Sequence, residues 1–265
     1  MGEAAETSDV IRTERRGAVE IITLNRPRVY NAINLELREA IQDAFDRFDA
    51  DDDAAVAVFT GAGGNFSSGR DLKAAARGEP NYRTRDAQVN GFSRLGAEKP
   101  VIAAVEGYAL AGGFELALAC DLIVAARDAK FGLPEVRHSI VALGGGLVRL
   151  PRRMPYHAAM MMALTGDQYP AADLHGWGIV GVLADPGAAL DAALRLAERI
   201  RLGGPLAIRA TKEIVRRSYD WGSERDAWDA QLSIARPALD SPDHAEGLRA
   251  FGEGRAPAWR NPEDA

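Results

Sequence analysis

Short apolar runs separated by glycine-rich or charged breaks dominate the first two thirds of the chain. Their length and content of β-branched residues predict strands. A first pair is joined across Arg15, Arg16 and Gly17, and three further runs are predicted to be buried strands. The predicted strands cover residues 10–13, 19–24, 55–60, 101–105 and 122–126.

Helical periodicity appears between and after these runs. Asn34 is a good N-cap, and apolar residues at helical spacing follow it, so a helix with one core face is predicted to reach about Asp49. Residues 143–150 lead through three glycines into another helix. Residues 160–166 are predicted to end a core helix whose methionines serve in packing.

The last third of the chain, from Gly187 onward, is predicted to be helical. An apolar stripe begins at Leu190, a second helix covers residues 207–221, and a third covers about 227–235 before Pro237 stops it. Helices that follow a mixed core without a second sheet suggest an oligomerisation layer. We therefore expect a core over residues 1–186 and a C-terminal helical region over 187–265.

Composition narrows the function classes. The 265 residues carry a net charge of −6, which argues against nucleic acid as the main partner but allows a local basic pocket. One cysteine excludes a disulfide framework and favours the reducing cytosol, so a cytoplasmic location is expected. The acidic, polar N-terminus predicts no signal peptide, no apolar run suggests a membrane span, and the four histidines show no metal-ligand spacing.

The stretch from Lys99 to Gly146 holds the candidate chemistry. Gly112 and Gly113 open an apolar helix, whose first N–H groups are unpaired and whose dipole favours an anion or a developing oxyanion. Glu115 lies in the first turn of this helix, and Glu135 follows the next strand behind a proline. Glu115 could simply complement the dipole and Glu135 could be a solvated loop acid, but two acids flanking one glycine-opened helix favour a functional pair.

Two other motifs are weaker. Gly61-x-Gly63 follows a strand, as in dinucleotide-binding folds, but Phe66 stands where the third glycine belongs and no helix pattern begins there. Phe66 also rules out a nucleophile elbow at Ser68. His175 is expected to be structural or on the surface.

The central stretch resembles the crotonase family of enoyl-CoA hydratases and isomerases. The matching segments are Lys99-Pro-Val-Ile-Ala-Ala-Val, Gly107-Tyr-Ala, Ala111-Gly-Gly-Phe-Glu-Leu-Ala-Leu-Ala-Cys-Asp121 and Phe131-Gly-Leu-Pro-Glu135. The resemblance implies an α/β spiral of repeated ββα units with C-terminal helices that form trimers or dimers of trimers. It also implies that Glu115 and Glu135 are the two acids of hydratase-type members, and that the N–H groups of Arg70 and Gly112 form the oxyanion hole.

The same resemblance implies a coenzyme A site. Arg28 and Ala32 lie in a segment that borders the CoA pocket of crotonases. A second segment, from Phe66 to Lys73, supplies half of the oxyanion hole in the family, and its residues from Arg70 to Lys73 follow the pantetheine and adenine. A neighbouring subunit's CoA site is implied for the C-terminal pair Phe251 and Arg255. The CoA-binding residues implied by the second segment are Ser68, Arg70, Asp71, Leu72 and Lys73.

Hydration of a 2-enoyl-CoA to a 3-hydroxyacyl-CoA is the activity that the acid pair favours, with CoA as part of the substrate and no separate cofactor or metal. An enoyl-CoA isomerase of the same fold and a non-catalytic acyl-CoA-binding protein are the alternatives. The chain departs from the family in the side chain of Arg70, in Phe114, and in residues 139–143, which lack the usual Gly…Pro-Gly pattern. The sequence does not name the acyl group, and residues 74–96, where crotonases border the acyl tail, show little periodicity.

Overall fold

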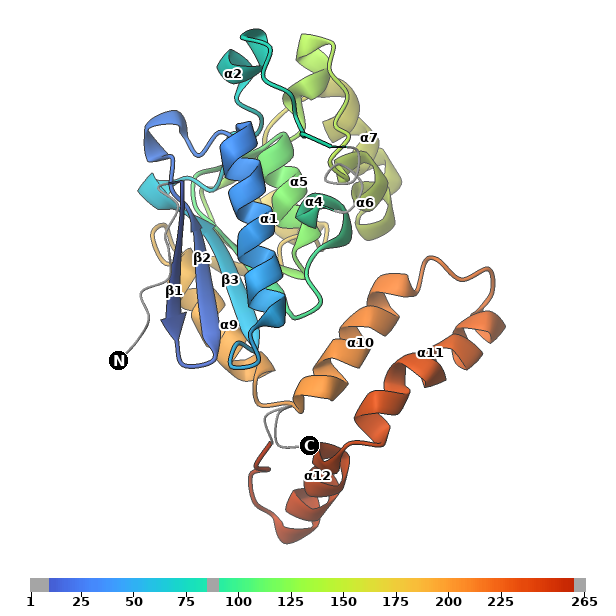
Figure 1. The fold of residues 1–265 in the computed structure, drawn as a ribbon. Coiled ribbons are helices and arrows are strands. Elements are labelled where there is room, and N and C mark those ends of the chain that lie inside the picture. The colour runs from blue at the N-terminus through green and yellow to red at the C-terminus, as the bar shows by residue number, and fades with distance from the viewer. Residues whose placement is uncertain (1–9, 85–90, 260–265) are drawn as a thin grey trace.

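The computed structural model of the protein describes residues 10–84 and 91–259. The N-terminal residues, for which the sequence predicts no signal peptide, lie outside the described residues. A six-stranded sheet forms the centre of the molecule, with strand order β1-β2-β3-β4-β6-β9. Figure 1 shows helix α1 across one face of this sheet and α9 at the other.

Five strands of the central sheet agree with the predicted runs, and the sixth, β9, was not predicted. Strand β1 pairs antiparallel with β2, and every later neighbour in the sheet is parallel. Parallel neighbours need crossovers, which the intervening helices supply. The strands are β1 (Ile11–Arg16), β2 (Val19–Leu24), β3 (Val56–Gly61), β4 (Val101–Val105), β6 (Leu122–Ala126) and β9 (Val182–Ala184).

A second, three-stranded sheet lies beside the first and makes the fold a spiral. The chain passes from β4 to β5 (Tyr108–Leu110), and again from β6 to β7 (Lys130–Gly132), before a helix follows each pair. Strands β5 and β7 are parallel, and β8 (Tyr169–Pro170) closes the sheet antiparallel to β7. Two successive ββα turns therefore stack, which brings the ends of β5 and β7 to the same edge.

Helices and short 3-10 turns follow most strands. Asn34 caps α1 by accepting a hydrogen bond from the N–H of Leu37, as predicted. The helices up to β9 are α1 (Leu35–Ala50), α2 (Leu72–Ala76), α4 (Phe92–Leu95), α5 (Gly112–Ala119), α6 (Gly146–Arg153), α7 (Tyr156–Thr165) and α8 (Ala171–Gly176), with 3-10 turns η1 (Pro27–Val29), η2 (Ala62–Gly64) and η3 (Pro134–His138). After β9 come α9 (Ala189–Ile200), α10 (Pro205–Arg217), α11 (Glu224–Leu239) and α12 (Pro242–Glu253).

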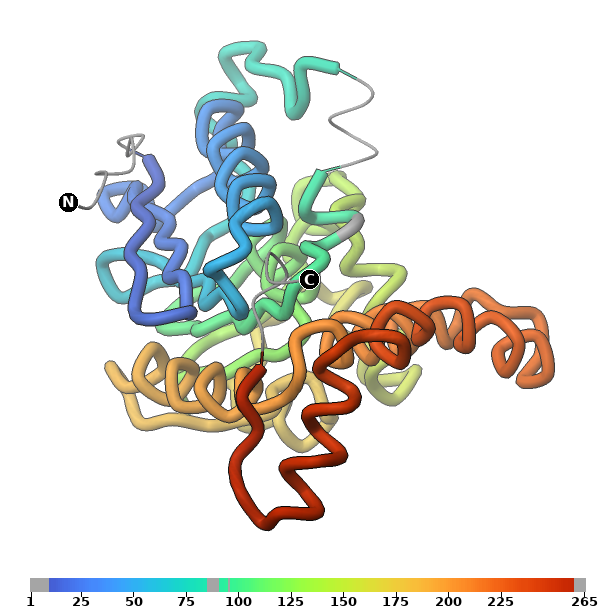
Figure 2. The backbone as a smooth tube through the Cα atoms, turned by 60° about the horizontal axis from the view of Figure 1, so that its bottom comes forward, coloured from blue at the N-terminus to red at the C-terminus, as the bar shows by residue number. Residues whose placement is uncertain are grey.

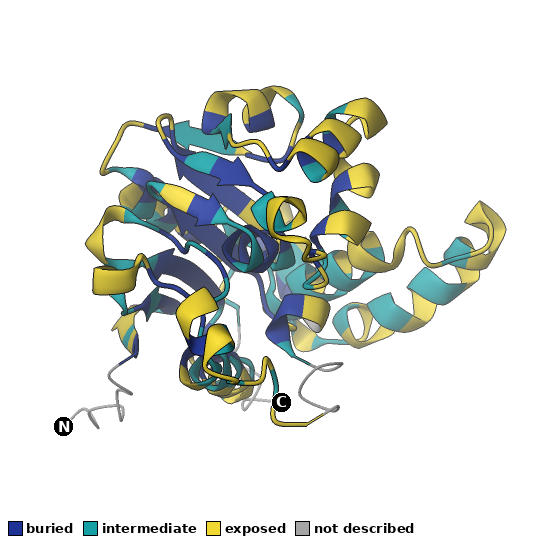
Figure 3. Cartoon of the chain, turned by 90° about the horizontal axis from the view of Figure 1, so that it is seen from above, coloured by how far each residue is buried: buried dark blue, intermediate teal, exposed yellow. Residues whose placement is uncertain are grey.

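Alternate residues of the strands fill two separate cores. In β4, Val101, Ala103 and Val105 face the larger core with α1 and α5, whereas Ile102 and Ala104 face α9. Both faces are covered, which explains why the parallel strands are continuous apolar runs. Figure 3 shows the buried strands in the interior and a mixed, partly exposed surface on the projecting helices.

The C-terminal helices differ from one another. Helix α9 packs on the sheet, while α10, α11 and α12 extend away from the body (Figures 1 and 2). Lys212 connects α10 to the body of the molecule, since its Nζ donates to Asp121 Oδ2 and to the carbonyl of Lys99, both at 2.7 Å. The boundary at residues 186 and 187 stays a prediction, although α9 belongs to the packed core.

Two details of the helices differ from the sequence-based expectation. Helix α11 continues through Pro237 to Leu239, because a proline in the last turn removes only one of the final hydrogen bonds. Of the methionines in α7, Met162 is buried, but Met160 and Met161 are exposed and do not pack in the core. None of the described helices is long and apolar enough to cross a bilayer.

Candidate active site

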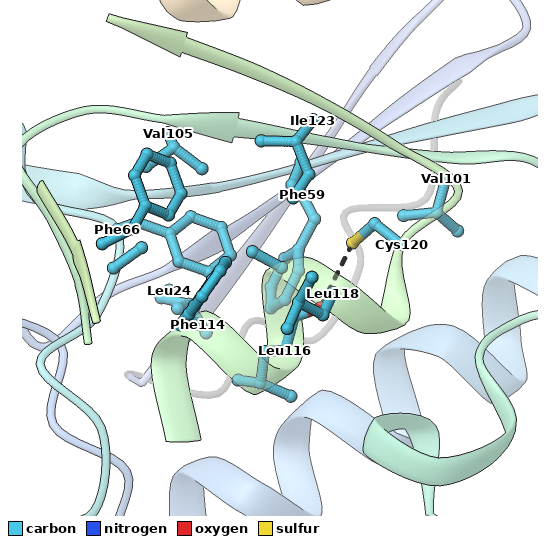
Figure 4. Close-up of a cluster of buried hydrophobic side chains, with 14 of the residues drawn as sticks. Leu24, Phe59, Phe66, Val101, Val105, Phe114, Leu116, Leu118, Cys120 and Ile123 are labelled. Carbon is cyan, nitrogen blue, oxygen red and sulfur yellow. Dashed lines mark hydrogen bonds between the residues drawn. The ribbon is translucent and has the colours of Figure 1, made fainter. Parts of the chain in front are cut away.

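Helix α5 is fixed by its buried face. Phe114 is fully buried and meets Phe131 edge to face, with ring centroids 5.2 Å apart. Figure 4 shows Phe114 and Leu118 of this helix in the cluster that includes Phe59 and Phe66. The residue before the helix, Ala111, has a φ of 51° and a ψ of −130°, which is unusual for alanine. Such strain persists only where packing enforces it, so the first turn of α5 is held in place.

The N–H groups of Arg70 and Gly112 lie at the start of this helix. Ile33 donates to the carbonyl of Gly69 at 2.7 Å and accepts from the N–H of Asp71 at 2.9 Å. The N–H of Arg70 therefore points away from Ile33, and a Cβ added to Gly112 would lie 3.8 Å from it. Neither N–H donates to another residue that the structure describes. Two such donors suit an oxygen that gains negative charge during a reaction.

Glu115 is buried on the same helix and is held by a loop. Its Oε1 accepts a hydrogen bond from the N–H of Gly146 at 3.0 Å, and its pKa is also influenced by a backbone hydrogen bond from Gly144. A Cβ on Gly144 would lie 2.4 Å from Glu115 Oε2, so a larger residue here would have to displace the carboxylate. Burial raises the pKa of Glu115, while these hydrogen bonds and the charges of Arg149 and Arg38 oppose the rise.

Arg149 supports the loop that holds Glu115. Its guanidinium donates to three carbonyl oxygens, those of Ser93 at 2.7 Å, Arg94 at 2.9 Å and Gly144 at 3.3 Å. Burial lowers the pKa of Arg149 to about 10, so the group remains a cation at neutral pH. The sequence analysis missed this residue, because nothing local links it to an acid 34 positions earlier.

Glu135 lies in η3, directly after β7. Burial and, to a lesser extent, the nearby charge of Glu115 together raise its pKa to about 7. Its Oε2 is buried and has no hydrogen-bond partner among the described residues. The fold therefore brings the two acids close enough to interact, with Glu135 as the carboxyl that holds a proton more readily near neutral pH.

The predicted CoA loops meet beside these groups. Ala32 is buried, Ser68 donates its N–H to the carbonyl of Tyr30 at 2.9 Å, and Asp71 caps α2. Arg26, which the sequence analysis missed, joins the loops because it donates to Asp71 Oδ2 at 3.2 Å and to the carbonyl of Ala32. The carboxylate of Asp71 is thus engaged within the protein.

Three predicted CoA residues are exposed at these loops. Arg28 lies in η1, and Leu72 and Lys73 begin α2. The remaining pair lies on or after α12, at the opposite end of the molecule from α2 in Figure 1. Phe251 is 89% exposed, and Arg255 Nη1 donates to Glu246 at 2.6 Å. Within one chain these two residues do not meet the acid pair, and their role at a neighbouring subunit's site stays a prediction.

Two cavities flank the acids. The first, which we call the Arg38 cavity, has a volume of about 210 Å³ and lies between α1 and residues 82–83 and 91–93. Its lining includes Ile33, Leu35, Arg38, Glu39, Gln42, Asp43, Tyr82, Arg83, Phe92, Ser93 and Leu116. The second, the apolar cavity, has a volume of about 480 Å³, lies between η3, α6 and α7, and includes Leu133, Glu135, Ile140, Val141, Leu147, Leu150, Met160 and Leu164.

The weaker motifs carry no site. The glycines after β3 form the 3-10 turn η2 and not the helix that a dinucleotide site needs. His175 Nδ1 lies 2.8 Å from the carbonyl of Val180, so His175 is structural. Among the described residues, no three histidine, cysteine or acidic side chains gather as metal ligands.

Comparison with known proteins agrees with this geometry. The family model for enoyl-CoA hydratase/isomerase matches residues 14–262. The chain is 40% identical over 255 residues to enoyl-CoA hydratase EchA19 of Mycobacterium tuberculosis, covering 94% of this chain and 95% of that protein. It is 41% identical over 259 residues to carnitinyl-CoA dehydratase of Salmonella arizonae, covering 96% and 99%.

Solved structures show the same fold. An enoyl-CoA hydratase from Mycobacterium tuberculosis superposes with a TM-score of 0.91 at 50% identity, covering 96% of this chain and all of that one. Enoyl-CoA hydratase EchA1 from Mycobacterium marinum gives 0.90 at 52% identity, covering 95% and 99%. The predicted crotonase fold is thus confirmed, and the chain belongs to the enoyl-CoA hydratase/isomerase, or crotonase, family.

Proposed function

We propose that the protein is an enoyl-CoA hydratase that adds water across the 2,3 double bond of a 2-enoyl-CoA. The observation that carries this proposal is the acid pair itself. Glu115 is held by backbone N–H donors, whereas Glu135 has a buried, unpartnered oxygen and a pKa raised to about 7. Two carboxyl groups with different environments suit a base and an acid that act together.

The reaction then proceeds as a balanced addition. Ionised Glu115 takes a proton from water while the water oxygen bonds to C3. The thioester oxygen becomes enolate-like and is stabilised by the N–H groups of Arg70 and Gly112, each donor being worth about 2.7–4 kcal/mol in comparable sites. Protonated Glu135 gives its proton to C2, which completes the 3-hydroxyacyl-CoA.

The reverse reaction on a different substrate is a second candidate, because the chain is 41% identical to a carnitinyl-CoA dehydratase. Dehydration of a 3-hydroxyacyl-CoA uses the same two acids with their proton states exchanged. Carnitinyl-CoA carries a quaternary ammonium group in its acyl chain. The cationic Arg38 beside Glu115 disfavours that group, so we give priority to hydration.

A direct assay tests the proposal. Purified protein should decrease the conjugated-enoyl absorbance of crotonyl-CoA as water adds, and it should leave a 3-enoyl-CoA unchanged. Conversion of the 3-enoyl-CoA into the conjugated isomer would instead identify an isomerase. Turnover of carnitinyl-CoA with no hydration of crotonyl-CoA would favour the dehydratase alternative.

We further propose that the protein forms trimers or dimers of trimers through α10–α12. These helices project from the body, and α11 and α12 expose large apolar side chains, including Trp228, Leu232, Leu248 and Phe251. Light scattering at micromolar concentration should give a mass at least three times that of the chain. A monomeric mass would contradict this assembly.

A further inference from the structure

Arg38 brings a positive charge to the Arg38 cavity, and the hydratase mechanism does not use it. Burial lowers the pKa of this guanidinium, yet an arginine keeps its proton at neutral pH. The carboxylate whose charge acts on it is that of Glu115, and the charge of Arg70 also acts on it. Arg38 therefore lies within electrostatic range of Glu115 and of the Arg70 side chain.

The described residues leave this charge without a carboxylate of its own. Arg38 Nη1 donates to the hydroxyl of Tyr82 at 3.2 Å, and its guanidinium lies 4.6 Å from the Tyr82 ring centroid. No acid of the described residues forms a salt bridge with it. A largely buried cation that lacks an anion favours binding one.

The other charges on this cavity do not satisfy Arg38. Glu39 is paired with Arg83 at 2.5 Å, so these two side chains neutralise each other at the rim. Asp43 is exposed to solvent. The rim therefore carries the exposed charge of Asp43 besides the Glu39–Arg83 pair, and the inner wall carries the guanidinium of Arg38.

The position of the cavity connects it to the reacting end of an acyl thioester. Ile33, which lines it, has its Cδ1 3.6 Å from where a Cβ on Gly112 would lie, and Leu116 follows Glu115 on α5. An acyl chain that leaves the acid pair in this direction reaches Arg38. The apolar cavity beside Glu135 offers the opposite direction and has no cation in its lining.

We propose that the acyl group which this site prefers carries a carboxylate at its far end, and that Arg38 binds this carboxylate. The substrate class is thus the CoA thioester of an unsaturated dicarboxylic acid. A planar guanidinium matches a carboxylate through two parallel hydrogen bonds, and the Tyr82 ring keeps the guanidinium plane in position. The inference rests on the proposed acyl-CoA chemistry of the same site and adds the nature of the acyl tail.

Binding of unreactive thioesters tests this without requiring turnover. Glutaryl-CoA and adipyl-CoA are compared by calorimetry with pentanoyl-CoA and hexanoyl-CoA, which have the same chain lengths and no carboxylate. Wild-type protein should bind the dicarboxylic thioesters about 10- to 100-fold more tightly, as expected for a charge-assisted pair. Tighter binding of the neutral thioesters would overturn the proposal and assign the tail to the apolar cavity.

Variants of Arg38 localise the effect. Arg38→Met should abolish the preference for dicarboxylic thioesters while leaving pentanoyl-CoA affinity within about 2-fold. Arg38→Lys should retain part of the preference, because lysine keeps the charge but lacks the two parallel donors of a guanidinium. Arg83→Met is the matched control, since Arg83 is paired at the rim, and it should keep the preference. Thermal unfolding of each variant checks that the fold is retained, and Tyr82→Phe provides a milder change at the same place.

Turnover separates this inference from the proposed function. Wild-type protein should hydrate glutaconyl-CoA with a higher kcat/KM than 2-pentenoyl-CoA, and Arg38→Met should reverse the order. Equal losses on both substrates would mean that Arg38 only adjusts Glu115, which would overturn the inference. Hydration of crotonyl-CoA without any diacid preference would refute the inference alone, whereas Arg38-dependent diacid binding without hydration would refute the hydratase.

Discussion

Two acids of this site sit in very different surroundings. Glu115 lies in the first turn of α5, whose side chains are buried in the core, and its carboxylate accepts a hydrogen bond from the N–H of Gly146. Glu135 lies on a 3-10 turn after a strand, and its buried Oε2 has no partner among the described residues. The same side chain thus becomes a positioned base in one place and a carboxyl with a pKa raised to about 7 in the other.

The different proton affinities of the two acids arise from their hydrogen bonds and neighbouring charges, and not from burial. Burial raises the pKa of both carboxyl groups. Two backbone N–H donors and two nearby cations oppose this effect at Glu115, whereas at Glu135 only its own backbone N–H opposes it and the charge of Glu115 adds to the rise. Changes to the loop that donates to Glu115 should therefore affect the position of the base, whereas changes in pH should affect the protonation of Glu135.

The largest effect is expected from removal of either acid. Glu115→Gln and Glu135→Gln keep size but lose proton transfer, so hydration of crotonyl-CoA should fall about 10²- to 10⁴-fold in each. The double variant should be scarcely worse than the poorer single one, because the pair acts as a unit. Stopped-flow absorbance and CoA-thioester binding are the measurements, with exposed Glu36→Gln as control. Normal hydration by Glu135→Gln would contradict the two-acid mechanism.

A smaller but selective effect is expected at the loop under Glu115. The added Cβ of Gly144→Ala would lie 2.4 Å from Glu115 Oε2 and must displace the carboxylate. A shift of about 1 Å can cost about 10²-fold in rate, so kcat should fall by about 10- to 100-fold with little change in thioester binding. Gly252→Ala is the control, because nothing lies within 4 Å of its added Cβ. An unchanged kcat in Gly144→Ala would show that this loop does not position the base.

The pH profile should reflect Glu135. Hydration needs this carboxyl protonated, and its pKa is raised to about 7, so kcat/KM should decline as pH rises through about 7. Glu115 must be ionised and sets the acidic limb at lower pH. Steady-state rates on crotonyl-CoA from pH 5 to pH 9 measure both limbs. A flat profile between pH 6 and pH 9 would be incompatible with Glu135 as the acid.

Variation of the CoA loops should affect binding more than chemistry. Arg28 and Lys73 are exposed at the two loops that border the site. They are predicted to contact the CoA part of the thioester and not the reacting carbons. Arg28→Ala or Lys73→Ala should raise KM for crotonyl-CoA several-fold while kcat changes little. If KM is unchanged in both variants, the CoA assignment of these loops is wrong.

The smallest effect concerns stability. The pKa of Glu135 is higher in the folded than in the unfolded protein, so the stabilising contribution of its protonated form is present below about pH 4 and is lost as pH rises through about 7. Glu135→Gln removes the buried charge and should stabilise the protein at pH 8 by an amount on the order of 1 kcal/mol, raising Tm by about 2–4 °C.

The same substitution at Glu115, and a second pH for Glu135→Gln, test the physical cause of this stabilisation. At pH 5 the gain for Glu135→Gln should shrink, because the wild-type carboxyl is then mostly protonated. Glu115→Gln should show no gain at pH 8, since an amide nitrogen would face the N–H groups that now donate to the carboxylate. Thermal unfolding at both pH values measures these differences, and a stabilising Glu115→Gln would contradict the assigned donors.

Local patterns in the sequence were enough to predict the five longest strands, the first turn of α5 and the family, whereas the short strands β5, β7, β8 and β9 were not predicted. Apolar runs gave β3, β4 and β6, and the glycine pair placed the start of the helix at Gly112. Glu115 and Glu135 were found from their order within one stretch that resembles the crotonases. The continuation of α11 beyond Pro237 was not predicted, because propensity alone does not show that the last turn tolerates a proline.

The groups that surround the acids could not be predicted from the sequence, because the tertiary structure brings them together. Arg149, Arg26 and Arg38 reach the site from distant positions, and no local pattern distinguishes them from solvated arginines. The pKa difference between Glu115 and Glu135 likewise depends on donors 29 and 31 residues away along the chain, at Gly144 and Gly146. Burial and long-range hydrogen bonds form only when the spiral closes, and for that reason the division between base and acid belongs to the fold.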